Sequence, residues 1–341
     1  MADFSAGLKK VLGATSVIVG TVIGAGYISG REIVEFFLTG DLAVSVLCSF
    51  LLVLPTLYFL LTNKLFEKGA LKNVSEIFIF AGNLVMLGGM LSAADEVFSS
   101  LFSFFSKIPL ISISTLIFCA LTVKKGINGI EKVNNVLIPF MLIITIVLMT
   151  FEGGFTYIPV FEIRPLKIIS YAGLNLFMSS SVFKKTGETL NKRQAFFASI
   201  LSATILFGLV FLIGLSLSGE AKLKTEPIPL LEKLSFSRGS RFIFTIVLYF
   251  GIVTTLLSEN LAVFECANKT IKSEKLRKTT KFLICVTAFS LSRIGFYNIV
   301  STLYPAVGII GAIFILLSVL FRLLSRREQR RDTSMRQARK V

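Results

Sequence analysis

The chain has 341 residues, of which 54% are hydrophobic, and these residues occur in long blocks. Blocks such as 43–61, 136–151, 198–217 and 306–323 are each about as long as a bilayer-spanning helix. They are too long and too uniform for barrel strands, and a backbone in lipid must satisfy its own hydrogen bonds. The composition therefore predicts an all-α integral membrane protein.

The net charge of +16 does not indicate a nucleic-acid partner, because nearly all charged residues lie between the apolar blocks or in the C-terminal tail. The four cysteines lie in or beside apolar segments without motif spacing, so we expect neither a disulfide framework nor a transition-metal site. The chain has no histidine, and its one acidic grouping, Asp95-Glu96, lacks a catalytic partner motif. We therefore expect no enzyme.

Ten spans are expected, in chain order 9–37, 42–61, 74–105, 108–123, 130–151, 166–183, 195–217, 241–268, 281–292 and 299–323. The first has the form of a signal peptide, but no small-residue cleavage site follows it. With the N-terminus inside, the cytoplasmic segments hold 26 of the 36 Lys and Arg residues. This bias predicts that both termini are cytoplasmic.

The first span carries four glycines in eleven residues: Gly20, Gly24, Gly26 and Gly30. Each weakens a helix by up to about 1 kcal/mol relative to alanine. A helix interrupted at Gly24-Ala25-Gly26 would free carbonyls for a cation and amides for an anionic solute group. Helix packing accounts for these glycines equally well, because both pairs, Gly20/Gly24 and Gly26/Gly30, have small-xxx-small spacing.

The eighth span carries one polar stripe, formed by Gly251, Thr254, Thr255, Ser258 and Glu259. Hydroxyls and carbonyls are suitable ligands for a hard cation such as Na⁺. A carboxylate in the membrane indicates a binding site or pathway. The alternatives are hydroxyls that bond back to their own helix and a structurally paired Glu259.

Two further spans carry polar residues. In the third span, Asp95 or Glu96 is expected to pair with Arg31. The sixth span is interrupted by polar and small residues, namely Tyr171, Gly173, Asn175 and the serines at 179–181. The outer connections 152–165 and 218–240 are long and contain proline, so each is a candidate lid or a plain solvated loop.

Interruptions in spans one and six, and acids in spans three and eight, occupy corresponding places in two halves of five spans. Since five is odd, the halves have opposite orientations, a pattern that indicates a transporter site at the midplane. We expect a first repeat at 1–151, a second repeat at 152–323 and a disordered basic tail at 324–341 that contacts lipid.

The segment Val22–Ile33, which reads VIGAGYISGREI, is followed by Phe36-Phe37. It resembles the signature of the YkvI-like bacterial membrane proteins, of the amino acid–polyamine–organocation superfamily. The resemblance implies a LeuT-type five-plus-five fold with discontinuous helices 1 and 6, in the bacterial cytoplasmic membrane.

In Na⁺-coupled members of this fold, a cation lies between first-helix carbonyls and a small-x-x-Thr/Ser-Ser/Thr pattern on helix eight. Residues 251–255 look like that pattern. The implied Na⁺ ligands are Gly20, Ile23, Gly251, Thr254 and Thr255. Some proton-coupled relatives carry a lysine midway along helix five, and its absence between Lys132 and Phe151 favours Na⁺. A second Na⁺ site is not expected, because Tyr27 stands where an Asn is required.

The resemblance therefore implies a Na⁺-coupled secondary active transporter of a small amine- or carboxylate-bearing, amino-acid-like solute. Spans one, two, six and seven would rock against the rest. The alternative is a sensor or receptor subunit that keeps the pocket without transporting, as germinant-receptor membrane subunits do. No cofactor other than Na⁺ is expected. The expected solute-binding residues are Gly24, Ala25, Gly26, Tyr27, Asn175, Ser179 and Glu259.

Overall fold

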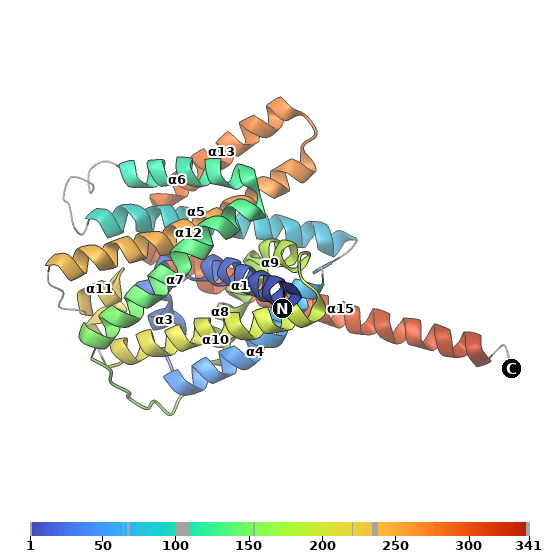
Figure 1. Ribbon diagram of the computed structural model, residues 1–341, viewed down its shortest axis with the longest axis horizontal. Helices are drawn as coiled ribbons and strands as arrows, with labels where there is room; N and C mark the ends of the chain where they lie inside the picture. The colour runs from blue at the N-terminus through green and yellow to red at the C-terminus, as the bar shows by residue number, and fades with distance from the viewer. Residues whose placement is uncertain are drawn as a thin grey trace.

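The structure is a computed structural model that describes residues 2–63, 65–66, 69–99, 109–152, 154–219, 221–233 and 238–338. All secondary structure in these ranges is helical (Figure 1). The elements are α1 (Ala2–Val22), α2 (Ala25–Ile28), α3 (Arg31–Phe36), α4 (Leu42–Thr62), α5 (Ala70–Ser99), α6 (Leu110–Thr122), η2 (Val123–Lys125), α7 (Ile127–Glu152), α8 (Pro165–Met178), α9 (Ser180–Gly187), α10 (Lys192–Leu217), η3 (Ala221–Lys224), α11 (Pro229–Lys233), α12 (Arg238–Thr270), α13 (Glu274–Ser292), α14 (Phe296–Asn298), η4 (Ile299–Leu303) and α15 (Tyr304–Ala338).

Six of the described helical segments are long and apolar enough to cross a membrane: α4, α5, α7, α10, α12 and the stretch Phe296–Leu324. The pair α8 and α9, bent by 58° at Ser179, adds a seventh if it is one span. Each of the other predicted spans also coincides with a helix, although α6 is short. The chain is therefore a multi-pass membrane protein.

The predicted boundaries differ from the structure at several points. The expected end of the third span at Phe105 and start of the fourth at Ile108 lie outside the described residues. The tail was expected to be disordered, but α15 continues as a helix to Ala338 and projects from the bundle (Figure 1). The ninth span is longer than predicted, because α13 begins at Glu274.

α12 lies at the centre of the bundle, against α1, α5 and α7. α6 and α13 lie on one side of α5, while α4 and α10 pack together on the other side of the molecule (Figure 1). α8 packs closely along α15: a Cβ on Gly311 would lie 2.6 Å from the carbonyl oxygen of Gly173. Gly173, which the sequence suggested as part of an interruption, therefore serves helix packing.

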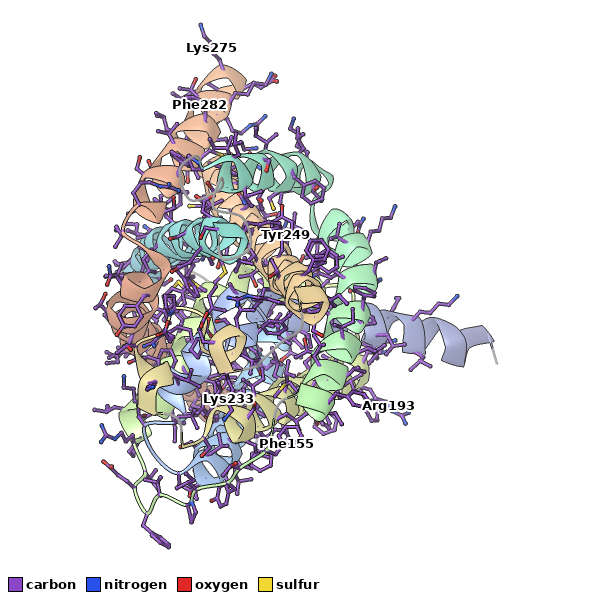
Figure 2. The ribbon with its side chains drawn as sticks, turned by 90° about the vertical axis from the view of Figure 1, so that its left-hand side faces the viewer. Phe155, Arg193, Lys233, Tyr249, Lys275 and Phe282 are labelled. Carbon is purple, nitrogen blue, oxygen red and sulfur yellow. The ribbon has the colours of Figure 1, made fainter. Side chains whose placement is uncertain are left out.

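Large apolar side chains cover the outside of the bundle. Leu51, Ile143 and Phe282 are 61%, 62% and 67% exposed, and Figure 2 shows Phe282 at the outer edge of α13. Lipid is as apolar as these side chains, so their exposure is the expected state of a membrane-spanning bundle.

Candidate solute and cation site

The first membrane helix is interrupted one to two residues earlier than the sequence predicted. α1 ends at Val22, and Gly24 has an extended backbone (φ −102°, ψ −168°) whose N–H turns back to the Val22 carbonyl at 3.0 Å. Ala25 and Gly26 already belong to the short helix α2. As a result, no backbone amide of the described residues donates to the carbonyl of Gly20 or of Ile23.

A second turn follows at Ser29-Gly30, where Gly30 has a φ of +80°. This left-handed conformation favours glycine because it has no Cβ. It separates α2 from α3, so the first helix runs as three pieces with two changes of direction.

The polar stripe of α12 faces this interruption. The Thr255 hydroxyl donates to the Gly20 carbonyl at 3.4 Å, and the Ser258 and Thr21 hydroxyls are 2.7 Å apart. A Cβ on Gly24 would lie 2.9 Å from Thr255 Oγ1, so the glycine permits the close approach.

Two of the five predicted cation ligands, Gly20 and Thr255, are in contact where α1 breaks, and Ile23 lies in the break itself. A Cβ on Gly251 would lie 3.5 Å from the Gly24 carbonyl oxygen, which shows how closely the two backbones approach. The fifth, Thr254, donates its hydroxyl to the Gly251 carbonyl of its own helix at 3.0 Å. The carbonyl and hydroxyl oxygens gathered here are of the type that a hard cation takes.

Two buried carboxyl groups lie close to the break. Glu259 on α12 is 3% exposed, and neither of its oxygens accepts a hydrogen bond from the described residues. Glu32 on α3 is also 3% exposed, and its Oε2 is equally without a donor. Glu259 lies one helical turn beyond Thr255, whose hydroxyl approaches Gly24 at the break. Glu32 also covers Gly26, where an added Cβ would overlap its carboxylate.

The sequence predicted Glu259 but missed Glu32. Glu32 lies directly after Arg31 near the predicted outer end of a span, where a charged pair reads as a solvated helix end. The second turn at Gly30 instead directs this part of the chain back into the protein.

The other predicted solute residues lie on the side of α8 and α10. Tyr27 donates its hydroxyl to the Leu206 carbonyl, and the Asn175 amide donates to the Tyr171 carbonyl of its own helix at 3.1 Å. Asn175 lines a cavity of about 10 Å³, which is room for about one water. Ser179 is buried at the bend between α8 and α9.

A larger cavity of about 350 Å³ opens at the lysine-rich end of the bundle, where α4, α5, α9 and α12 meet. We call it the vestibule. A cavity of this size holds a small solute. Lys185 forms an ion pair with Glu265 on its wall. Its charged and polar lining includes Lys72, Glu76, Ser181, Lys184, Glu265 and Lys269.

The opposite end of the broken helix is sealed. The buried Leu230 of α11 donates its N–H to the Ser29 carbonyl at 2.8 Å. The Arg31 guanidinium lies 4.5 Å from the centre of the Tyr297 ring and 3.5 Å from the Glu226 carbonyl oxygen. The connection 218–240, one of the two candidate lids, therefore covers this end with its described residues.

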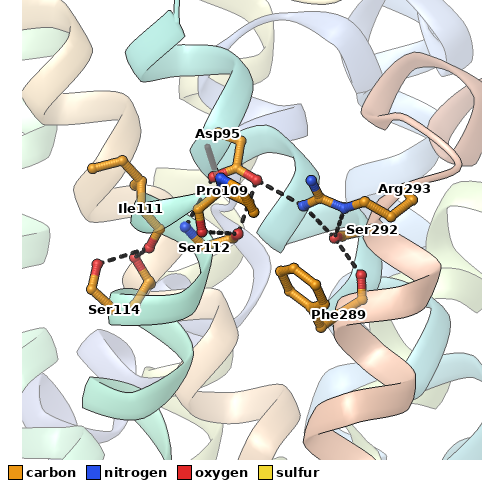
Figure 3. Close-up of polar contacts among 9 residues, drawn as sticks. Asp95, Pro109, Ile111, Ser112, Ser114, Phe289, Ser292 and Arg293 are labelled. Atoms are coloured by element: carbon orange, nitrogen blue, oxygen red, sulfur yellow. Dashed lines mark hydrogen bonds and ion pairs between the residues drawn. The ribbon is translucent and has the colours of Figure 1, made fainter. Parts of the chain in front are cut away.

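The expected pairing of Arg31 with Asp95 or Glu96 is wrong. Arg31 pairs with Glu35 on its own helix at 3.2 Å, and Lys167 of α8 also pairs with Glu35. Asp95 instead pairs with Arg293 at 2.7 Å and accepts two hydrogen bonds from Ser112 (Figure 3). The Asp95 network joins α5, α6 and α13.

The other candidate lid, the connection after α7, is largely exposed over residues 154–164. It is attached through Asp41, which caps α4 and accepts hydrogen bonds from the N–H of Val44, the Tyr157 hydroxyl and the N–H of Val160. These bonds, the Val44 bond foremost, hold the pKa of Asp41 below its usual range.

No family model matches the chain. Among curated proteins it is 26% identical to the uncharacterized membrane protein YkvI of Bacillus subtilis (strain 168), over 335 residues that cover 88% of this chain and 92% of the relative. The predicted resemblance to YkvI is thus confirmed.

Two solved structures share the architecture. MhsT in complex with L-phenylalanine superposes with a TM-score of 0.65 and 15% identity, covering 90% of this chain and 88% of MhsT. MHP1, a nucleobase-cation-symport-1 family transporter in a closed conformation with bromovinylhydantoin bound, superposes with a TM-score of 0.60 and 13% identity. The match covers 89% of this chain and 77% of MHP1. These two structural neighbours are transporters rather than enzymes. The chain is therefore similar to YkvI over most of its length and has the LeuT-type fold of these two structures, as the segment Val22–Ile33 predicts.

Proposed function

We propose that this protein is a secondary active transporter of a small amine- or carboxylate-bearing, amino-acid-like solute. It works by alternating access, with ten spans in two inverted repeats and both termini in the cytoplasm. The observation that carries the proposal is the difference between the two ends of the bundle: α11 and Arg31 cover the broken helix at one end, while the vestibule opens at the other. In this topology the vestibule faces the cytoplasm, so the conformation is inward-facing.

Na⁺ is the proposed coupling ion. The carbonyls of Gly20, Ile23 and Gly251 and the hydroxyls of Thr254 and Thr255 would hold it. The proposal is supported by the two carbonyls that the break leaves without amide donors and by the Thr255 hydroxyl beside one of them. The Thr254 hydroxyl has to turn away from the Gly251 carbonyl to take part.

The solute would bind to the backbone of Gly24, Ala25 and Gly26, with Asn175 and Ser179 completing the pocket and Glu259 setting the charge preference. The bound ligands of MhsT and MHP1, L-phenylalanine and bromovinylhydantoin, are small molecules of the size that such a pocket takes. The cavity beside Asn175 holds only about one water in this conformation. Binding therefore requires α8 and the broken helix to move apart.

The test is solute uptake into vesicles that contain the purified protein. Candidate solutes are first ranked by thermal stabilisation in detergent, with and without Na⁺, because a ligand that binds the folded state raises its stability. We expect the stabilising solute to accumulate only with an inward Na⁺ gradient. A solute that binds but does not move under a Na⁺ or a proton gradient would overturn transport and indicate the sensor function.

A further inference from the structure

Glu32 and Glu259 are two buried carboxyl groups for which the described residues provide no positively charged partner. Both side chains are almost fully buried, and no lysine or arginine of the described residues forms an ion pair with either. A buried carboxylate is stable when a cation or several hydrogen-bond donors compensate it. Three of the four carboxylate oxygens have no donor. The pair therefore lacks a positive partner.

The groups around the pair do not supply one. Cys119 of α6 is close enough to interact electrostatically with Glu259, and Tyr27 of α2 and Tyr171 of α8 with Glu32. Tyr304 of α15 is buried in the same region and forms no hydrogen bond with either carboxyl. None of these groups is a cation, and the adjacent Arg31 guanidinium is held by Glu35 and the Tyr297 ring.

A further polar atom points to a ligand at the same place. The Tyr304 hydroxyl is fully buried and has no hydrogen-bond partner among the described residues. Gly89 of α5 leaves room beside it, since an added Cβ would lie 3.2 Å from this hydroxyl. Buried polar atoms are nearly always satisfied, so several unsatisfied ones around one spot indicate a missing ligand that provides donors.

Protonation alone satisfies the pair poorly. One proton on each carboxyl removes the charge but supplies only two O–H donors, whereas three carboxylate oxygens and the Tyr304 hydroxyl are unpaired. An ammonium group carries three donors and a positive charge, and aromatic rings favour it further. A ligand ammonium therefore matches both the charge and the hydrogen-bonding capacity.

We propose that Glu32 and Glu259 bind the protonated amine of a solute between them, and that the solute carries a net positive charge. The inference rests on the proposed function and narrows it, because it selects organic cations over carboxylates and neutral amino acids. Glu32 contacts the break through Gly26, and Glu259 lies one turn beyond Thr255 on α12. The amine would thus bind next to the Na⁺ site.

The test compares four probes of similar length: 1,4-diaminobutane, butylamine, 1,4-butanediol and succinate. Binding to the purified full-length protein in detergent is measured by the shift in Tm and by titration calorimetry. We expect the diamine to bind most tightly, the amine less tightly, and the diol and succinate not to bind. Glu32→Gln and Glu259→Gln should each weaken diamine binding by at least tenfold. Glu274→Gln, at an exposed glutamate paired with Lys278, should not change it.

The ligand-free variants provide a measurement that needs no bound probe. Because each glutamine removes an uncompensated carboxyl, the Tm without ligand should not fall in either variant. A marked fall would show that the carboxyl has a structural partner and would overturn the proposal. So would equal binding of the diol or succinate, diamine binding that survives the double variant, or a wild-type protein that neither amine stabilises.

Failure of this inference is distinguishable from failure of the proposed transport. A neutral or anionic solute that accumulates in vesicles, while amines do not bind, overturns the cation site and leaves transport intact. Amine binding that depends on both glutamates, without flux under any gradient, supports the cation site and overturns transport.

Discussion

In the proposed alternating-access motion, Arg31 joins parts of the protein that would separate when the sealed end opens. Its contacts across that boundary include the Tyr297 ring at 4.5 Å and the Glu226 carbonyl at 3.5 Å, while its partner Glu35 lies on the same helix and moves with it. A desolvated cation–π contact contributes about 1 to 2 kcal/mol, and the long hydrogen bond adds less. Arg31→Gln should therefore favour opening by about 2 kcal/mol, or about 30-fold in the equilibrium constant.

The assay is the rate at which a maleimide modifies a cysteine placed at Leu231, a buried residue of α11, in a chain whose native cysteines are replaced by alanine. While the open state is rare, this rate is proportional to its population. We expect Arg31→Gln to raise the rate about 30-fold. Arg293→Gln is the matched control. It removes the ion pair between α5 and α13, two helices that the proposed motion does not separate, and it should leave the rate unchanged. An unchanged rate in Arg31→Gln, or an equal rise in the control, refutes the reasoning.

Three further predictions concern single residues. Thr255→Ala should weaken the Na⁺ dependence of thermal stability. The control Thr245→Ala, which loses a hydroxyl bonded within α12, should leave this dependence unchanged. An unchanged Na⁺ response in both variants would reject the cation site. Gly26→Ala should abolish solute binding and lower the free energy of unfolding by about 1 to 3 kcal/mol, because the new methyl displaces the Glu32 carboxylate that covers Gly26. The control Gly208→Ala places its methyl in open space and should leave the Tm unchanged. Asp41→Asn should lower the Tm at pH 7. Because the pKa of Asp41 is depressed, the stabilisation by its carboxylate is complete above the ordinary pKa of about 3.9 and is lost as pH falls through the folded value. The difference in Tm between the wild type and Asp41→Asn should therefore vanish on acidification. A difference that stays constant with pH would contradict the assignment.

The sequence by itself determined the class of the protein and much of its broken helix. Long apolar blocks dictate helices in lipid, and for that reason six to seven of the predicted spans coincide with described helices that are long and apolar enough to cross a membrane. The clustered glycines located the interruption to within two residues, because their cost to a helix is local. The spacing of the α12 stripe placed Thr255 on the correct face, since helical periodicity fixes which residues share a face.

Only the tertiary structure decided which groups meet. Arg31 could pair with any acid at its end of the bundle, and the two turns around α2 direct it to Glu35 and Tyr297 rather than Asp95. The same turns bring Glu32 back over Gly26, so a residue that reads as a solvated helix end becomes a buried carboxyl beside the break. Sequence periodicity specifies a face within one helix. Contacts between helices depend on how a broken helix changes direction, which no local pattern encodes.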